Sequence, residues 1–219
     1  MSADRELTVA GEELWLLGEK AIWWPAQRAL LIADAHFGKA AAYRSLGQPV
    51  PHGTTGTNLA VLQQVIDRHP VEQLVFLGDF LHGPGSHAEG TLKQLRDWRA
   101  ANRALRIVLI RGNHDHRAGD PPADLDFDVV PEPLLLGNLA LQHEPHPHPE
   151  RHVLAGHVHP VFFLNGRGRQ RLRLPCFHVG QQVTLLPAFG AFTGGFAVDR
   201  KPGVRLFVVG DGQVWPVAG

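Results

Sequence analysis

Aspartate, asparagine and histidine residues gather in five short blocks along this chain of 219 residues. Four of the blocks directly follow an apolar run typical of a buried strand, and the fifth follows the shorter run Val153-Leu154-Ala155. Carboxylate, amide and imidazole groups are the side chains that hold catalytic metal ions in proteins. The blocks are Asp34-Ala35-His36, Gly78-Asp79-Phe80-Leu81-His82, Gly112-Asn113-His114-Asp115, His143, and Gly156-His157-Val158-His159.

Side chains of these types suit a pair of divalent ions. Two ions about 3.5–4 Å apart can hold the attacking and leaving oxygens of a phosphoryl displacement, and they generate hydroxide from water near neutral pH. Such a site needs one carboxylate that bridges the ions. The mixed oxygen and nitrogen donors favour manganese, iron or zinc over calcium, and the set lacks the thiolates of structural zinc sites.

Alternating strands and helices in the first half of the chain would bring the blocks together. This order predicts a right-handed parallel core. Because ligands bind beyond the carboxyl ends of the strands in open α/β sheets, the blocks should share one edge of the fold. We expect an opening hairpin over 14–17 and 21–24, strands over 29–33, 74–77 and 105–110, and helices over 58–69 and 87–101.

Beyond about Asp126 the pattern changes to short strands separated by Gly and Pro, which predicts a second, mostly antiparallel sheet. No long polar linker or internal repeat divides the chain, so we expect a single domain over residues 1–219. The expected strands cover 127–130, 134–136, 139–142, 153–155, 169–179, 182–186 and 204–209.

Composition bounds the partners and the compartment. The formal net charge is zero, so no global charge favours nucleic acid or a membrane surface. The single cysteine, Cys176, fits a reducing compartment. The first residues lack the pattern of a signal peptide, and no apolar run approaches the roughly 20 residues that span a bilayer. We therefore expect a cytoplasmic protein.

In their order and spacing, the five blocks resemble those of the calcineurin-like metallophosphoesterases. The resemblance implies an α/β (α+β sandwich) fold of four layers, α/β/β/α, with two packed mixed sheets. It also implies two metal ions and a metal-activated hydroxide that hydrolyses phosphodiester bonds. The implied ligands are Asp34, His36 and His159 for the first ion, Asn113, His143 and His157 for the second, and Asp79 as the bridge.

The same resemblance places His114 beside the phosphate, as general acid or transition-state stabiliser. Its neighbour Asp115 is a candidate to orient that imidazole. His143 is preferred to His146 and His148 as a ligand, because the expected strand 139–142 leads directly into it.

The flanking segments resemble a bacterial branch of the family, the ligase-associated DNA damage response endonucleases. These are manganese-dependent phosphodiesterases encoded beside a DNA ligase and a helicase. The resemblance implies Mn²⁺, a single-stranded DNA or other phosphodiester substrate, a role in DNA repair, and the ligase and helicase as functional partners. A small-molecule or cyclic-nucleotide phosphodiesterase, a phosphomonoesterase, and a metal-free scaffold are the alternatives. The segments are 33–39, Arg44, Gly47, Pro51, Thr55, 78–82 and 186–195.

Three further residues are candidate substrate contacts: Lys39, Arg44 and His82. Lys39 and Arg44 suit a phosphodiester, although both also fit a solvated loop and helix start. His82 would either donate a hydrogen bond to a substrate phosphate or contact the metal ligands without binding the metal itself. Four arginines alternate from Arg167 to Arg173 and would share one strand face. That face is either a track for nucleic-acid phosphates or a charged edge that discourages aggregation.

Overall fold

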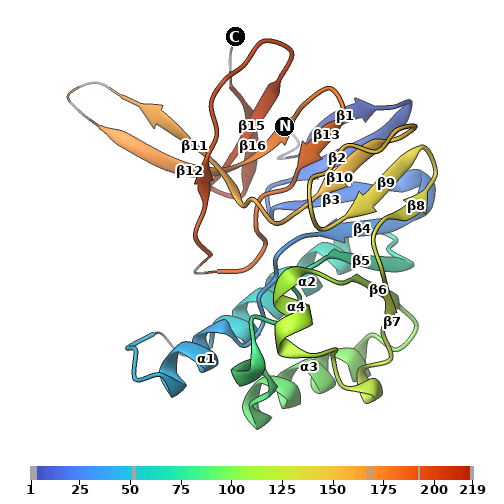
Figure 1. The fold of residues 1–219 in the computed structure, drawn as a ribbon, viewed down its shortest axis with the longest axis vertical. Coiled ribbons are helices and arrows are strands. Elements are labelled where there is room, and N and C mark those ends of the chain that lie inside the picture. Colours follow the sequence, from blue (N-terminus) through green and yellow to red (C-terminus); the bar gives the residue numbers. More distant parts are fainter. Residues whose placement is uncertain (1–3, 51–52, 167, 169, 192, 218–219) are drawn as a thin grey trace.

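Two β-sheets packed face to face form the centre of the molecule, as seen in a computed structural model (Figure 1). The structure describes residues 4–50, 53–166, 168, 170–191 and 193–217. The expected calcineurin-like sandwich of two packed mixed sheets is confirmed. No helix among these residues is long and apolar enough to cross a membrane.

The first sheet has seven strands in the order in which they occur along the chain. The predicted opening hairpin forms β2 and β3 of its antiparallel half, to which β1 adds a strand that the sequence did not predict. The predicted strand–helix–strand core forms β4 to β6 of its parallel half, and β7 adds the last strand. The strands are β1 (Arg5–Val9), β2 (Glu12–Leu17), β3 (Ala21–Trp24), β4 (Ala29–Ile32), β5 (Gln73–Leu77), β6 (Arg106–Ile110) and β7 (Asp128–Val130).

The second sheet combines antiparallel pairs with three parallel ones, β9–β10, β10–β13 and β11–β14. Our expectation that residues 127–130 belong to this sheet was wrong. They include β7, which pairs in parallel with β6 and forms an edge strand of the first sheet. The strands are β8 (Leu134–Leu136), β9 (Leu139–Gln142), β10 (His152–Ala155), β11 (Pro160–Asn165), β12 (Arg171–Val179), β13 (Val183–Leu185), β14 (Phe196–Ala197), β15 (Arg205–Gly210) and β16 (Gln213–Pro216).

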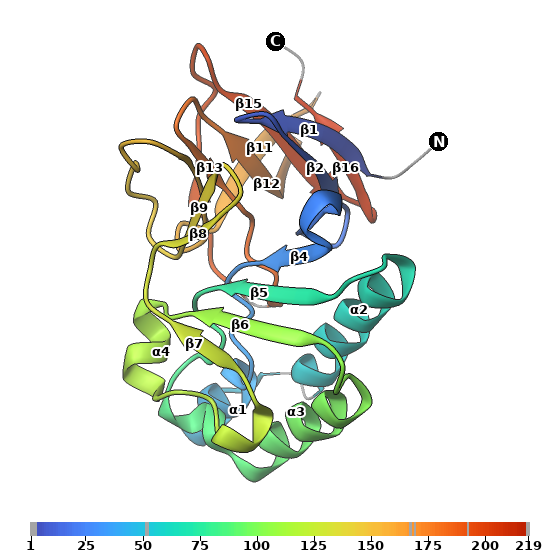
Figure 2. The same cartoon turned by 90° about the vertical axis from the view of Figure 1, so that its right-hand side faces the viewer.

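All α-helices of the described chain precede residue 119 and lie on the side of the first sheet (Figure 2). The helices are α1 (Lys39–Ser45), α2 (Thr54–Arg68), α3 (Glu89–Ala101) and α4 (Asn113–Ala118), with short 3-10 turns η1 (Pro25–Gln27), η2 (Pro84–His87) and η3 (Ala123–Leu125). After η3, the described part of the chain forms strands and no α-helix.

Apolar packing fixes these layers against one another. Leu62 and Leu95, on the buried faces of α2 and α3, belong to the same core as Phe76 of the first sheet. The opposite face of that sheet contributes Val75 to a second core, which it shares with Phe177 of the second sheet. Burying one such side chain contributes about 1.5–3 kcal/mol. The carboxyl ends of strands in both sheets are thereby held in fixed relative positions.

Candidate metal centre

The polar blocks lie where strands of both sheets end. Asp34 and Asp79 follow β4 and β5, and Asn113 begins α4 after β6. From the second sheet, His143 follows β9 and His157 follows β10. β4 pairs in parallel with β5, β5 with β6, and β9 with β10, and this pairing brings these ends to one edge of the sandwich. This arrangement agrees with the prediction from the sequence that the polar blocks share one edge of the fold.

The backbone at this edge adopts an uncommon conformation. Left-handed φ values are rare for residues with a side chain and cost of order 1–3 kcal/mol each, so their clustering indicates a functional site. Five candidate ligands share this conformation: Asp34 (φ 54°), His36 (φ 46°), Asp79 (φ 50°), His157 (φ 68°) and His159 (φ 50°).

Glycine is required at Gly78 for two reasons. Its φ is +79°, and a Cβ there would overlap the imidazole of His143. Gly112 serves a similar purpose, because a Cβ at that position would overlap the Asp79 carboxylate. The glycine that opens each motif therefore makes room for a ligand that comes from another part of the chain.

Asp34, His36 and His159 form the first group of converging donor atoms. His159 Nε2 lies 3.3 Å from Asp34 Oδ1 and 3.4 Å from His36 Nε2. The backbone N–H of His157 donates to the Asp34 carboxylate, at 3.0 Å to Oδ2. This bond orients the Asp34 carboxylate toward the two histidines.

Asn113, His143 and His157 form the second group. Asn113 Oδ1 lies 3.0 Å from both His143 Nε2 and His157 Nδ1, and the two ring nitrogens are 3.1 Å apart. His143 Nδ1 donates to the carbonyl of Leu77 at 3.0 Å. With Nδ1 engaged by this carbonyl, Nε2 is the ring nitrogen of His143 that faces the Asn113 side-chain oxygen.

The carboxylate of Asp79 lies between the two groups. Its Oδ2 is 3.7 Å from His36 Nε2, and its Oδ1 is 3.5 Å from His143 Nε2. The backbone N–H of His114 donates to Oδ1 at 2.8 Å. A single carboxylate therefore faces both sets of donors with different oxygens.

Burial sets the charge state of the centre. Asp34 and Asp79 are almost fully buried, and their ion-pair partners in the described part of the chain are histidines. Desolvation raises the pKa of Asp79, and burial holds the pKa of His36 well below its ordinary value. Buried charges are normally paired or bound to metal, and imidazoles are the ion-pair partners of both carboxylates here.

These observations together fit divalent metal ions. Asn113 Oδ1 and His143 Nε2 converge at 3.0 Å, where both atoms could bind one cation. The donors are oxygen and nitrogen atoms of the types that bind transition metals. The clusters Asp34–His36–His159 and Asp34–Asp79–His143 each place three such atoms close enough to share one ion.

His114 points into the same space from the first turn of α4. Its Nδ1 hydrogen bonds to the carbonyl of His82 at 2.6 Å, and its Nε2 lies 4.0 Å from Asp79 Oδ2. The bond to His82 makes Nδ1 the donor in the neutral ring. Nε2 is therefore the atom that remains available at the centre.

Asp115, the candidate to orient the His114 ring, is bonded to backbone groups. Its carboxylate is fully buried and accepts hydrogen bonds from the N–H groups of Leu81 (3.1 Å) and Gly112 (2.9 Å). Desolvation raises the pKa of Asp115, while these backbone bonds oppose the shift. Asp115 thus joins the loop after β5 to the start of α4, and its influence on the orientation of His114 stays a prediction.

The candidate substrate residue His82 lies beside the centre. Its ring stacks on His114 with 4.8 Å between centroids, and its Nδ1 is 3.4 Å from His36 Nδ1. Burial, with Lys39 and His114 nearby, lowers the pKa of His82 to about 4. His36, His82 and His114 form a third group of converging donors.

The two basic candidates lie at opposite ends of α1. Lys39 begins the helix and is half-buried. Desolvation lowers the pKa of Lys39, and the nearby carboxylate of Asp79 partly opposes this shift. Arg44 donates to the carbonyl of Val50 and lines a pocket of about 260 Å³ with Thr55 and Thr91. Contact of Lys39 or Arg44 with a phosphate stays a prediction.

Sequence reasoning missed the groups that hold His143 in place. Glu132 accepts hydrogen bonds from the backbone N–H of His143 (2.6 Å) and of Glu144 (3.1 Å). It lies in the connection between β7 and β8, with no motif around it, and a pocket of about 220 Å³ beside the centre includes it. His146, the discarded alternative, pairs with Glu144 at the surface, and 76% of its side chain is exposed.

The family of the chain is shown by comparison with known proteins. A family model described as calcineurin-like phosphoesterase matches residues 27–183. The chain belongs to this family, and it is a metal-dependent phosphoesterase.

Among solved structures, the chain is similar to the Pseudomonas putida nuclease MPE. The two are 52% identical, with a TM-score of 0.88 over 98% of this chain and 100% of that one. The Escherichia coli phosphoesterase Yfce is 18% identical, with a TM-score of 0.37 over 84% of this chain and 88% of that one. No curated protein matches the chain.

Proposed function

We propose that this protein is a two-metal phosphodiesterase that acts on DNA. The position of Asp79 carries the proposal, because its two oxygens face His36 on one side and His143 on the other. Asp34, His36 and His159 would hold one ion, and Asn113, His143 and His157 the other. Asp79 would contact both.

When bound, two divalent ions would polarise the phosphate and lower the pKa of a bound water to near neutrality. The chain supplies the remaining functions. His114 presents Nε2 toward the centre while the His82 carbonyl fixes its tautomer. In its protonated form the ring would donate a proton to the leaving oxygen. Asp115 would hold the loop that carries His82 and the turn that carries His114 at their observed separation.

Similarity to a nuclease over nearly the whole chain supports a polynucleotide substrate, and single-stranded DNA is our first choice. Mn²⁺ is the proposed metal, with iron or zinc as alternatives compatible with the donor set. A role in DNA repair beside a ligase and a helicase rests on the resemblance of the flanking segments alone.

A small-molecule phosphodiesterase is the second candidate. The zero net charge of the chain favours it, because a short substrate needs no extended basic surface. A metal-reconstituted panel separates the candidates. It compares bis-p-nitrophenyl phosphate, p-nitrophenyl phosphate, a 2′,3′-cyclic nucleotide, and linear and circular single-stranded DNA. Cleavage of circular DNA would show endonuclease action, whereas hydrolysis of the small substrates alone would favour the second candidate.

Replacement of Asp79 tests the metal centre itself. In Asp79→Ala both ions lose a shared ligand, so we expect bound manganese to fall and bis-p-nitrophenyl phosphate hydrolysis to drop by orders of magnitude. Metal content is measured by mass spectrometry after gel filtration, with the exposed-residue variant His146→Ala as control. Near-normal hydrolysis by metal-loaded Asp79→Ala would contradict the two-metal proposal.

A further inference from the structure

Basic charge is concentrated in one continuous stretch of this neutral chain. Residues 151–198 contain five arginines and none of the 21 Asp and Glu residues. The rest of the chain is therefore net acidic. The stretch includes His157 and His159 of the metal centre and the whole β11–β12 hairpin, so the basic segment and the centre are adjacent in sequence.

The hairpin has two different faces. Residues directly opposite in an antiparallel pair share a face, and alternate residues do as well. Phe163 is opposite Arg173, and Asn165 is opposite Arg171, so these four lie on one face. The other face is apolar, with Leu164 opposite Leu172, and these leucines are 37% and 56% exposed.

The basic face carries two guanidinium groups in defined positions. Arg171 stacks on the ring of Phe163, with its Cζ 3.7 Å from the ring centroid, and both Arg171 and Arg173 are exposed. Arg167 and Arg169, the other two arginines of the predicted stripe, lie outside the described residues. Arg–aromatic stacking holds a guanidinium flat while leaving its N–H groups open to an anion.

The inner end of this face adjoins the metal centre. The guanidinium of Arg173 lies against Gly195, where a Cβ would overlap its Nη2 and would be 3.0 Å from the carbonyl of His159. β14 continues from Gly195 and pairs with β11, which begins at Pro160. The β11–β12 hairpin and α1 project on the same side of the molecule (Figure 1).

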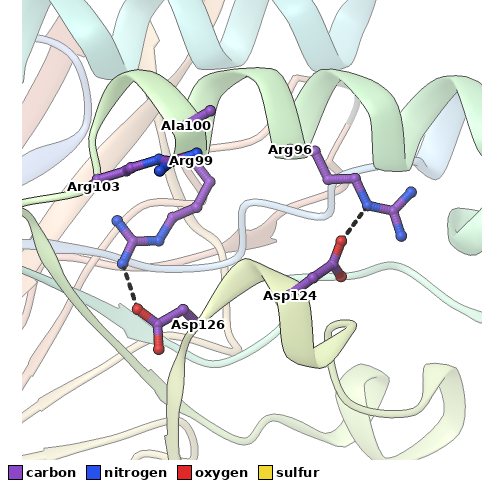
Figure 3. A pocket seen from close by; sticks show the side chains of 6 residues that line it. All are labelled: Arg96, Arg99, Ala100, Arg103, Asp124 and Asp126. Atoms are coloured by element: carbon purple, nitrogen blue, oxygen red, sulfur yellow. Dashed lines mark hydrogen bonds and ion pairs between the residues drawn. The ribbon is translucent and has the colours of Figure 1, made fainter.

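A second group of arginines has a different environment. Arg96, Arg99 and Arg103 line a pocket of about 410 Å³ between α3 and η3 (Figure 3). Two of them are paired with carboxylates, Arg96 with Asp124 at 2.6 Å and Arg99 with Asp126 at 3.0 Å. Local acids thus offset this cluster, whereas residues 151–198 contain none.

We propose that the Arg171–Arg173 face of the β11–β12 hairpin binds the phosphates of a single nucleic-acid strand and leads it to the metal centre. The inference rests on the proposed function and deepens it, because it assigns the surface that distinguishes a polynucleotide from a short phosphodiester. Exposed guanidinium groups next to an aromatic ring are a common arrangement for single strands, where they contact the sugar-phosphate backbone.

The test measures binding of a fluorescent single-stranded oligonucleotide to metal-free protein at several salt concentrations. For single strands the slope of log K against log salt is roughly 0.7 per phosphate contacted. Arg171→Gln/Arg173→Gln should therefore lower the slope by about 1.4. Arg171→Lys/Arg173→Lys keeps the charge and should retain most of the slope. Arg96→Gln/Arg103→Gln removes the same charge from α3 and should leave the slope unchanged.

Hydrolysis provides the second readout. In the metal-loaded glutamine double variant, kcat/KM on single-stranded DNA should fall, while bis-p-nitrophenyl phosphate hydrolysis stays at the parent rate. An unchanged salt slope, or an equal fall in the α3 control, would overturn the proposal. A parent protein that binds DNA with the expected slope but hydrolyses no phosphodiester would refute the proposed function and leave the hairpin assignment standing.

Discussion

At the scale of single residues, the imidazole of His114 is the group whose role the geometry defines most narrowly. General acid catalysis contributes roughly 10²–10⁴-fold where the leaving group needs a proton. We expect His114→Ala to lose this factor on DNA, whose alkoxide is a poor leaving group, and far less on bis-p-nitrophenyl phosphate. Single-turnover rates on the two substrates, with metal content measured in parallel, check this. Equal losses on both, or missing metal, would assign His114 to another role.

The left-handed backbone at His159 leads to a stability prediction. Glycine normally destabilises a protein relative to alanine, but a left-handed conformation costs a residue with a Cβ about 1–2 kcal/mol. Since φ at His159 is +50°, metal-free His159→Gly should be more stable than His159→Ala by about 1 kcal/mol. Urea unfolding of both variants tests this. The neighbouring residue Val158 does not have a positive φ and serves as control. There, Val158→Ala should be more stable than Val158→Gly.

At this scale, the sequence predicted side chains that lie in motifs, but not the backbone groups that contact them. Asp34, Asp79, Asn113 and the histidines of the centre were candidates from the sequence, because short motifs carry them. The Leu77 and His82 carbonyls were not, since every residue has a carbonyl and only the fold decides which one meets an imidazole. For the same reason the sequence did not indicate that the Asp115 carboxylate accepts hydrogen bonds from the N–H groups of Leu81 and Gly112.

At the scale of elements, the turn between β2 and β3 is fastened to the segment after β13. Lys20 Nζ donates to the Phe189 carbonyl at 2.6 Å. In turn, the Phe189 and Gly190 N–H groups donate to the carbonyls of Ala33 and Asp34. A half-buried lysine thus supports the backbone that carries the first candidate ligand.

This contact predicts a pH dependence of stability. Burial lowers the pKa of Lys20 from 10.5 to about 8, so between these values the unfolded chain binds more protons than the folded one. The free energy of unfolding should therefore rise from pH 8 to 10.5 relative to Lys20→Met, which lacks the titrating group. Urea titrations across this range measure the difference. A parallel curve for wild type and Lys20→Met would contradict the assignment, and the exposed-lysine variant Lys201→Met serves as control.

Elements with strong periodicity were predicted within a few residues, as α2, α3 and the strands β4 to β6 show. Others left no signal. Among the α1 side chains whose burial is described, Ala40 alone is deeply buried, and the helix has no apolar repeat. β14 is two residues long and pairs with β11. β7 was recognised but assigned to the wrong sheet, because three residues do not reveal which edge they join.

At the scale of the whole molecule, a neutral total conceals an uneven distribution of charge. Composition alone gave no reason to expect a polyanion, yet the stretch from 151 to 198 contains five arginines and no acidic residue, and two of these arginines, Arg171 and Arg173, lie on one face of the β11–β12 hairpin. Net charge describes the long-range field of a protein, and it does not describe a surface that a ligand touches. A polynucleotide and a nitrophenyl diester would therefore meet different charge environments on the same molecule.

The candidate ligands come from both sheets, and this has a consequence for biosynthesis. The chain emerges from the ribosome from its N-terminus, so Asp34, His36, Asp79 and Asn113 are available well before His143, His157 and His159. On the proposed ligand set, neither ion finds its full set of donors until the second sheet has been translated and has packed on the first. Metal loading would then be a late event, and the choice of metal would reflect the ions that surround the finished fold rather than the nascent chain.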